Sequence, residues 1–218
     1  MHSHPLLWDS RADSFLHDCF DAELHKKTLR SVRDAVLGTL ASARAGVAHI
    51  GRGLAQARGL RPKHAIKQVD RLLSNHRLDL EALAPSWLAF VVGNRTDIVI
   101  AFDWTDFAKD DQSFTIEERF RDIKDWRFGM GVSAVRMANP HQRDRLLLIV
   151  ALAQTLLHVL GAAGESLGMD RLLKVNTVKT RVHSLYHQGQ TYPSAPVVLT
   201  DLLRFYRDVL GHALCCTS

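Results

Sequence analysis

Cysteine is scarce in this chain, and the few cysteines present lack the spacing of a disulfide framework or a zinc site. The 218 residues include three cysteines, Cys19, Cys215 and Cys216. Adjacent cysteines rarely pair with each other, because their backbone positions do not allow normal disulfide geometry. We therefore expect a reduced chain without structural disulfides, as is usual for a cytoplasmic protein.

Targeting and low-complexity segments are also lacking. The start of the chain, MHSHPLLWDSRADSF, has neither a basic n-region nor an apolar h-region, which excludes a typical secretory signal peptide. No internal repeat or low-complexity tract is visible. The histidines near the N-terminus are read as exposed terminal residues rather than metal ligands.

Only one stretch approaches the length of a membrane span. Leu146–Ala163 reads LLLIVALAQTLLHVLGAA and is 18 residues long, at the lower edge of transmembrane length. Gln154, His158 and Gly161 interrupt it. We therefore predict that Gln142–Gly161 forms a buried helix of a globular core, that 161–168 is a loop-like break, and that the chain has no membrane partner.

Charge is distributed unevenly along the sequence. The whole chain carries a formal net charge of +5. Residues 26–75 contain 11 Lys and Arg against 2 Asp and Glu, whereas residues 76–125 contain 6 against 11. A basic block followed by an acidic block suits a DNA-binding module followed by a metal-binding one. Chance segregation of surface charge is the alternative.

The basic block has the periodicity of three short helices. Apolar residues recur at helical spacing over 21–43, over about 45–57 and over 62–75. Gly59 separates the second helix from the third, and Pro62 stands where a first helical turn tolerates proline. The pattern fits a helix-turn-helix-like module, and equally a small helical bundle with a cationic surface.

A strand and a second helix carry the acidic residues of interest. Ile98–Phe102, IVIAF, is the clearest strand pattern in the chain, and Asp103 follows it at once. A carboxylate at the end of a buried strand is held rigidly enough to bind a metal ion, although such a residue also serves as a plain turn residue.

The second helix is predicted within Phe114–Gly131. Thr115 and Glu118 have the spacing of a capping box. Glu117, Arg121 and Lys124 lie at i, i+4 and i+7 and therefore share one helix face. The alternative interpretation is a solvated amphipathic helix with ion pairs along it.

Two segments resemble one family of enzymes. IEERFRDIKDWRFGMG closely resembles the C-terminal signature of insertion-sequence transposases of the DDE class, in the branch that includes the transposases of the composite tetracycline- and kanamycin-resistance transposons. IVIAFDWTDF resembles the first catalytic block of the same family. The resemblance implies that Asp103 and Glu117 are catalytic acids that bind Mg²⁺ or Mn²⁺. It implies DNA contact by Lys124, whose helix face Arg121 shares.

Two further segments resemble that family. KHAIKQVDRLLSN looks like part of the N-terminal domain that recognises the terminal inverted repeats of the element. Lys63, Lys67 and Arg71 lie at i, i+4 and i+8 and are the candidate phosphate contacts. The adjacent His64 is a candidate for a base contact or for a helix cap. Asn176–Ser184 is similar to the family's NTVRxRxxS-type segment. We predict helix around Arg171–Arg181 and a last helix over 197–213.

The sequence departs from the family between the two acids. In the family, a long stretch with further strands of a ribonuclease H-like sheet and the second catalytic aspartate separates them. Here only residues 104–116 do so. We therefore predict a mainly α protein with one or few β-strands. Residues 1–92 are expected to form a helical DNA-binding domain. Residues 93–218 are expected to form a truncated ribonuclease H-like remnant, with a strand over 97–103, the signature helix over 115–127 and C-terminal helices.

Three functional hypotheses remain open at this stage. The chain is a metal-dependent transposase that cleaves and joins DNA strands, a DNA-binding regulator of transposition without chemistry, or a decayed gene product. The resemblance implies double-stranded DNA as partner, with a further copy of the chain or a full-length transposase as a second partner. It also implies a bacterial cytoplasmic, nucleoid-associated location.

Overall fold

The computed structural model describes residues 5–93, 121–125, 127, 129–174, 177 and 181–192. Within these residues the chain is mainly α-helical, as predicted, and has no β-strand. The predicted strand over 97–103 and the predicted helix over 197–213 lie outside the described residues. The elements in chain order are α1 (Pro5–Phe20), α2 (Lys26–Ser42), α3 (Val47–Arg58), α4 (Pro62–Leu73), α5 (Leu80–Val92), η1 (Val132–Ala134), α7 (Pro140–Ser166), η2 (Met169–Leu173) and α8 (Leu185–Thr191).

Side chains at the helix starts explain several of these boundaries. The side chain of Asp79 accepts a hydrogen bond from the Glu81 backbone N–H at 3.0 Å and caps α5. Asn139 accepts from the His141 N–H at 3.0 Å and caps α7, with Pro140 at the first helical position. These bonds satisfy backbone donors that have no partner inside the helix.

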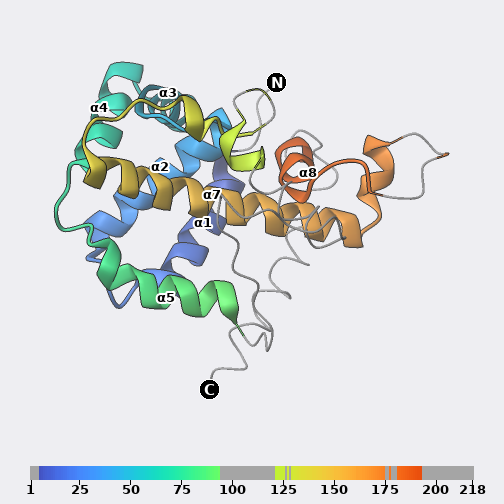
Figure 1. The fold of residues 1–218 in the computed structure, drawn as a ribbon, viewed down its shortest axis with the longest axis horizontal. Helices are drawn as coiled ribbons and strands as arrows, with labels where there is room; N and C mark the ends of the chain where they lie inside the picture. Colours follow the sequence, from blue (N-terminus) through green and yellow to red (C-terminus); the bar gives the residue numbers. More distant parts are fainter. Residues whose placement is uncertain are drawn as a thin grey trace, which may run out of the picture.

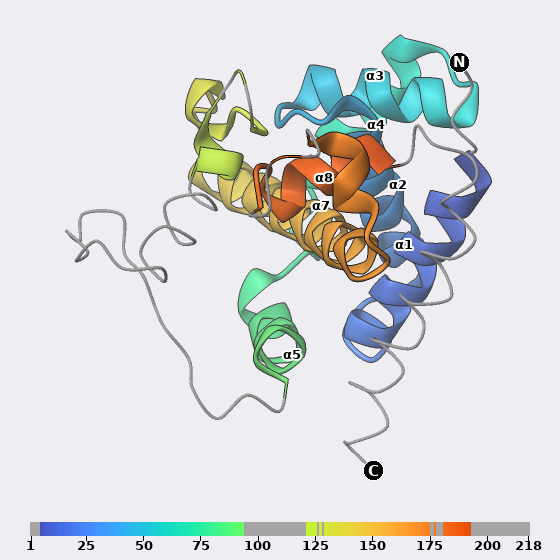
Figure 2. The same cartoon turned by 90° about the vertical axis from the view of Figure 1, so that its right-hand side faces the viewer.

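The helix α7 is the centre of the fold. It runs along the long axis of the molecule (Figure 1), with α3 and α4 on one side of it and α5 on the other in both views (Figures 1 and 2). One hydrophobic core takes side chains from every long helix, including Phe15, Val36, Ile50, Leu83 and Ile149. Helices from before and after residue 92 therefore share this core, and the predicted division into two domains stays a prediction.

An aromatic cluster joins α1 to α5. The ring of Phe15 packs edge-on against Phe90 at a centroid distance of 5.0 Å and against Trp87 at 6.3 Å. Trp87 stacks on Phe90 at 5.9 Å. Such contacts stabilise a packed core beyond the burial of apolar area alone, and here they hold α5 against the N-terminal helix.

The predicted break at 161–168 is wrong, because α7 continues to Ser166. Gly161 and Gly164 are part of the helix. A Cβ added at Gly161 would lie 1.9 Å from the backbone oxygen of Leu185, and one added at Gly164 would lie 2.0 Å from the ring of Tyr192. These glycines let α8 and the residue after it approach α7 closely, and they do not end the helix.

The apolar part of α7 is mostly inside the protein. The helix Pro140–Ser166 is long and apolar enough to cross a membrane, and 61% of its most apolar window is buried in the structure. Its buried face includes Ile149, Leu152 and Leu156. The burial is that of a core helix, which is the interpretation that the sequence favours.

The described residues after α7 are less helical than predicted. Around Arg171–Arg181 the described residues form the short helix η2, which ends at Leu173, and residues 181–184 precede α8. Ser184 starts α8 by accepting a hydrogen bond from the His187 N–H at 3.2 Å. Lys179 lies outside the described residues.

Candidate nucleic-acid interface

The helices α3 and α4 are joined by a tight turn that contains glycine. Only Gly59, Leu60 and Arg61 lie between the end of α3 and the start of α4. Gly59 has a left-handed conformation, with φ of 65°, and the Leu60 N–H donates to the carbonyl of Ala55 at 2.9 Å. Two helices connected by a turn of three to four residues, often with glycine, are the arrangement of a helix-turn-helix.

Glycines inside the helices bring α2, α3 and α4 close together. A Cβ added at Gly51 on α3 would lie 2.5 Å from the Cα of Ile66 on α4. One added at Gly53 would lie 2.2 Å from the backbone oxygen of Gly38 on α2. The three helices therefore pack closely together, and this packing fixes the position of α4 relative to α2 and α3.

The helix α4 separates its residues cleanly into two faces. Ala65, Val69, Leu72 and Leu73 are buried, each with 4% exposure or less. The side chains of Lys63, His64, Lys67 and Arg71 are exposed on the opposite side. We call these four residues the α4 basic face. The structure thus brings together the four candidate DNA contacts, and the described residues give none of them a salt-bridge partner.

Most of the charge in the basic block is directed to solvent. Of its 11 Lys and Arg residues, nine are exposed. Arg33 and Arg58 are half-buried and pair internally. Arg33 lies 2.7 Å from the carboxylate of Asp13, and Arg58 lies 2.7 Å from that of Asp34. Asp13 and Asp34 therefore neutralise the two half-buried arginines, and the second acid of the block, Asp70, is exposed on α4 among the outer cations.

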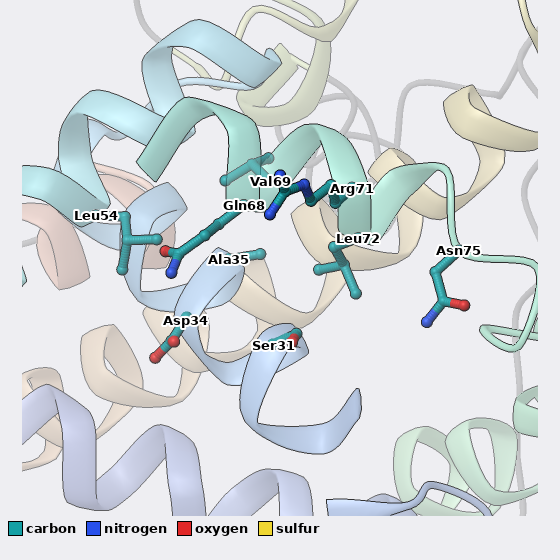
Figure 3. A pocket seen from close by; sticks show the side chains of 9 residues that line it. All are labelled: Ser31, Asp34, Ala35, Leu54, Gln68, Val69, Arg71, Leu72 and Asn75. Carbon is teal, nitrogen blue, oxygen red and sulfur yellow. The ribbon is translucent and has the colours of Figure 1, made fainter. Parts of the chain in front are cut away.

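A polar groove runs beside the α4 basic face. It has a volume of about 360 Å³ and lies between α2 and α4, and Leu54 of α3 also lines it. Figure 3 shows Asp34 and Gln68 at one end of the groove and Asn75 at the other. Arg71 lies on its α4 side, so the groove borders the basic face directly.

The start of α7 supports the C-terminal end of α4. The side chain of Arg145 is 8% exposed, and its guanidinium donates to the carbonyls of Leu73 at 2.9 Å and Leu78 at 3.0 Å. The amide of Gln142 donates to the hydroxyl of Ser74 at 2.8 Å. Cationic groups at a helix C-terminus satisfy its free carbonyls and interact favourably with the helix dipole. Sequence analysis missed both residues.

The helix predicted over 115–127 is described only from Arg121, and it ends earlier than predicted, because Asp125 and Arg127 are not helical. It is a different element from α4. Arg121–Lys124 is helical, with Arg121 exposed and Lys124 half-buried. The buried Asp122 accepts a hydrogen bond from Ser184 at 3.2 Å, so two segments that are 62 residues apart in the sequence are in contact. The carbonyl of Met130 accepts from the N–H of Ala45 at 2.7 Å, which attaches the exit of this helix to the α2–α3 loop.

The two predicted catalytic acids are not among the residues that the structure describes. Asp103 and Glu117, expected to be both catalytic and metal-binding, lie outside the described residues. The fit of Mg²⁺ or Mn²⁺ to them therefore stays a prediction. Within the described ranges, no three His, Cys, Asp or Glu side chains are grouped as a metal ion would require.

Two titratable groups are perturbed by burial away from α4. Burial raises the pKa of the Cys19 thiol to about 12, with smaller contributions from Asp18 and Glu23. Partial desolvation lowers the pKa of His187, and the neighbouring His183, whose ring centroid is 4.9 Å away, lowers it further. Cys19 is on α1 and His187 is on α8, so neither group belongs to the α4 basic face.

Comparison with protein-family models, with curated proteins and with solved structures finds no match to this chain.

Proposed function

We propose that this chain is a DNA-binding module of insertion-sequence transposase type that binds double-stranded DNA through α4 and regulates transposition without cleaving DNA. The observation that carries the proposal is the α4 basic face, presented after the three-residue turn Gly59–Arg61. The resemblance of the sequence around α4 to the end-recognition domain of these transposases adds the terminal inverted repeats as the expected target.

The size of α4 suits the major groove. A helix with its side chains is about 10 to 12 Å across, and the major groove of B-DNA is about 12 Å wide. The 12 residues of α4 are backed by α2, α3 and α7 and leave one face open. A rigidly supported helix with an open polar face is the element that helix-turn-helix proteins insert into this groove.

The chemistry of the face favours the phosphate backbone. Lys63, Lys67 and Arg71 follow one another at i, i+4 and i+8, so three cations lie along one side of α4. Each cation that neutralises a phosphate releases a condensed counterion, which makes the affinity fall as salt is added. Lysine contacts to phosphate position a protein on DNA, and sequence choice comes from base contacts.

The catalytic hypothesis is the alternative to this proposal. Asp103 and Glu117 would hold Mg²⁺ or Mn²⁺, and a bound ion would activate the attacking oxygen and stabilise the leaving one. The short segment between them leaves out the position of the family's second aspartate. We therefore propose binding without strand cleavage.

DNA binding is tested by fluorescence anisotropy with a labelled duplex over a series of salt concentrations. We expect Lys63→Ala/Lys67→Ala to weaken binding and to reduce the slope of log K against log salt by about 0.9 for each lost phosphate contact. The matched control is Arg171→Ala, which removes an exposed cation from η2, at the opposite end of the molecule from α4 (Figure 1). Equal affinity and equal slope in all three proteins would refute the proposal.

Sequence preference and cleavage are tested with two further DNA substrates. Repeated selection from a duplex pool with a randomised core is expected to enrich one sequence if α4 reads bases, and no enrichment would limit the proposal to backbone binding. A supercoiled plasmid that carries the selected sequence is expected to remain uncut with Mg²⁺ or Mn²⁺. Nicking that Glu117→Gln abolishes would instead establish the enzymatic hypothesis.

A further inference from the structure

The groove between α2 and α4 has a cation on each side. Arg71 lies on the α4 side. On the α2 side, Ser31 lines the groove and its hydroxyl donates to the backbone carbonyl of Lys27 at 3.0 Å, one helical turn earlier. Residues at i and i+4 share a helix face, so Lys27 lies at the end of the α2 stripe that borders the groove. Its side chain is exposed.

The neighbouring Lys26 belongs to a different stripe of α2. That stripe continues two turns later to Arg33, and Arg33 pairs with Asp13 of α1 at 2.7 Å. That stripe therefore faces the α1 side of α2. Lys27 precedes the groove residue Ser31 by one turn, and Arg30 precedes the groove residue Asp34 by one turn.

The groove itself carries no uncompensated negative charge. Its one acid, Asp34, lies 2.7 Å from Arg58 and 3.6 Å from Arg33. The other polar groups of the groove are the hydroxyl of Ser31 and the side-chain amides of Gln68 and Asn75. Amide N–H groups are common donors to phosphate oxygens in protein–DNA complexes, whereas the Ser31 O–H already donates within α2.

We propose that the α2–α4 groove is a second DNA contact surface, in which Lys27 and Arg71 hold one sugar-phosphate strand from its two sides while α4 lies in the adjacent major groove. This inference rests on the proposed function and extends it, because it assigns a DNA contact to α2. The contacts of Lys27 and Arg71 to the DNA backbone fix the depth and the orientation of α4 on the duplex. They add affinity without sequence preference.

The first test compares Lys27→Ala with Lys26→Ala in the same anisotropy assay. The two variants remove the same charge from adjacent exposed positions, and only Lys27 belongs to the stripe beside the groove. We expect Lys27→Ala to lower the salt slope by about 0.9 and Lys26→Ala to leave it close to that of the parent protein. Equal slopes in the two variants would overturn the inference.

The second test places a charge inside the groove. Ser31→Glu and Ser31→Gln introduce side chains of nearly equal size at an exposed helix position, so they differ mainly in charge. We expect Ser31→Glu to bind DNA about fivefold more weakly than Ser31→Gln, because a carboxylate close to a phosphate repels it. Thermal unfolding of both variants checks that they remain folded to the same extent.

The two proposals fail in different ways. If the parent protein binds DNA, Lys63→Ala/Lys67→Ala weakens binding, and Lys27→Ala and Ser31→Glu behave like their controls, the groove proposal is wrong and α4 remains the binding element. If the parent protein does not bind duplex DNA at all, the proposed function fails and the groove proposal falls with it.

Discussion

Arg145 and Leu73 are 72 residues apart in the sequence and joined by a hydrogen bond of 2.9 Å between the guanidinium of α7 and the last carbonyl of α4. The same guanidinium donates to Leu78 at 3.0 Å. A helix from the second half of the chain therefore supports the end of the helix that we propose to bind DNA. This contact couples the folding of α7 to the position of α4.

Replacing Arg145 tests that coupling. Arg145→Met removes two hydrogen bonds and leaves the carbonyls of Leu73 and Leu78 buried without their donor, which costs about 1 to 3 kcal/mol for each group. We expect the free energy of unfolding in urea to fall by about 2 to 6 kcal/mol. Arg145→Lys keeps the charge but lacks the planar guanidinium that donates to both carbonyls. Its free energy of unfolding should lie between those of the parent protein and Arg145→Met. A stability of Arg145→Met equal to that of the parent protein would show that the contact contributes nothing.

Glycine positions offer a second stability test. In Gly53→Ala the new methyl group would lie 2.2 Å from the backbone oxygen of Gly38, so α2 and α3 must move apart, at a cost of about 1 to 3 kcal/mol. In Gly59→Ala the methyl group meets nothing within 4 Å, and only the left-handed conformation is strained. We expect Gly53→Ala to unfold at a clearly lower temperature than Gly59→Ala, and the reverse order would contradict the packing described for α2 and α3.

His187 makes the stability depend on pH. Because the folded protein lowers the pKa of His187 below 6.5, the unfolded chain binds a proton more readily than the folded one. The contribution of His187 is therefore fully present above about pH 6.5 and is lost as the pH falls through the lowered folded-state value. We expect urea unfolding curves to show this loss in the parent protein and a smaller one in His187→Gln. An equal pH dependence in the two proteins would exclude His187 as its source.

Cys19 provides a probe of unfolding. Its thiol is 5% exposed, and burial raises its pKa to about 12, so at neutral pH the folded protein contains almost no reactive thiolate at this position. In a Cys215→Ser/Cys216→Ser variant, we expect Cys19 to react with a thiol reagent only when the protein unfolds. Rapid modification under native conditions would mean that α1 separates readily from the core.

The sequence predicts local features of α3 and α4 well. The segment predicted over about 45–57 is observed as Val47–Arg58, and the one predicted over 62–75 is observed as Pro62–Leu73. Their apolar spacing is regular, and Gly59 and Pro62 mark the turn between them. The exposed face of α4 follows from the same periodicity, because a buried stripe at Ala65, Val69 and Leu72 leaves the cations outside.

Long-range contacts explain what the sequence did not predict. No helix is assigned from sequence to the start of the chain, where α1 packs Phe15 against Phe90 of α5. Gly161 suggested a break in α7, although it is the point at which α8 approaches. The role of Arg145 depends on carbonyls that lie far away in the sequence. None of these contacts leaves a periodic pattern in the residues themselves.

The most direct test of DNA binding through α4 is to map the contact residue by residue. Backbone amide NMR spectra of isotope-labelled protein would be recorded during titration with a short duplex at low salt. We predict that the largest shifts fall on α4 between Lys63 and Arg71 and that the amides of η2 and α8 remain unchanged. Shifts concentrated on η2 and α8, or an absence of shifts with excess duplex, would contradict the assignment of α4 as the DNA-binding helix.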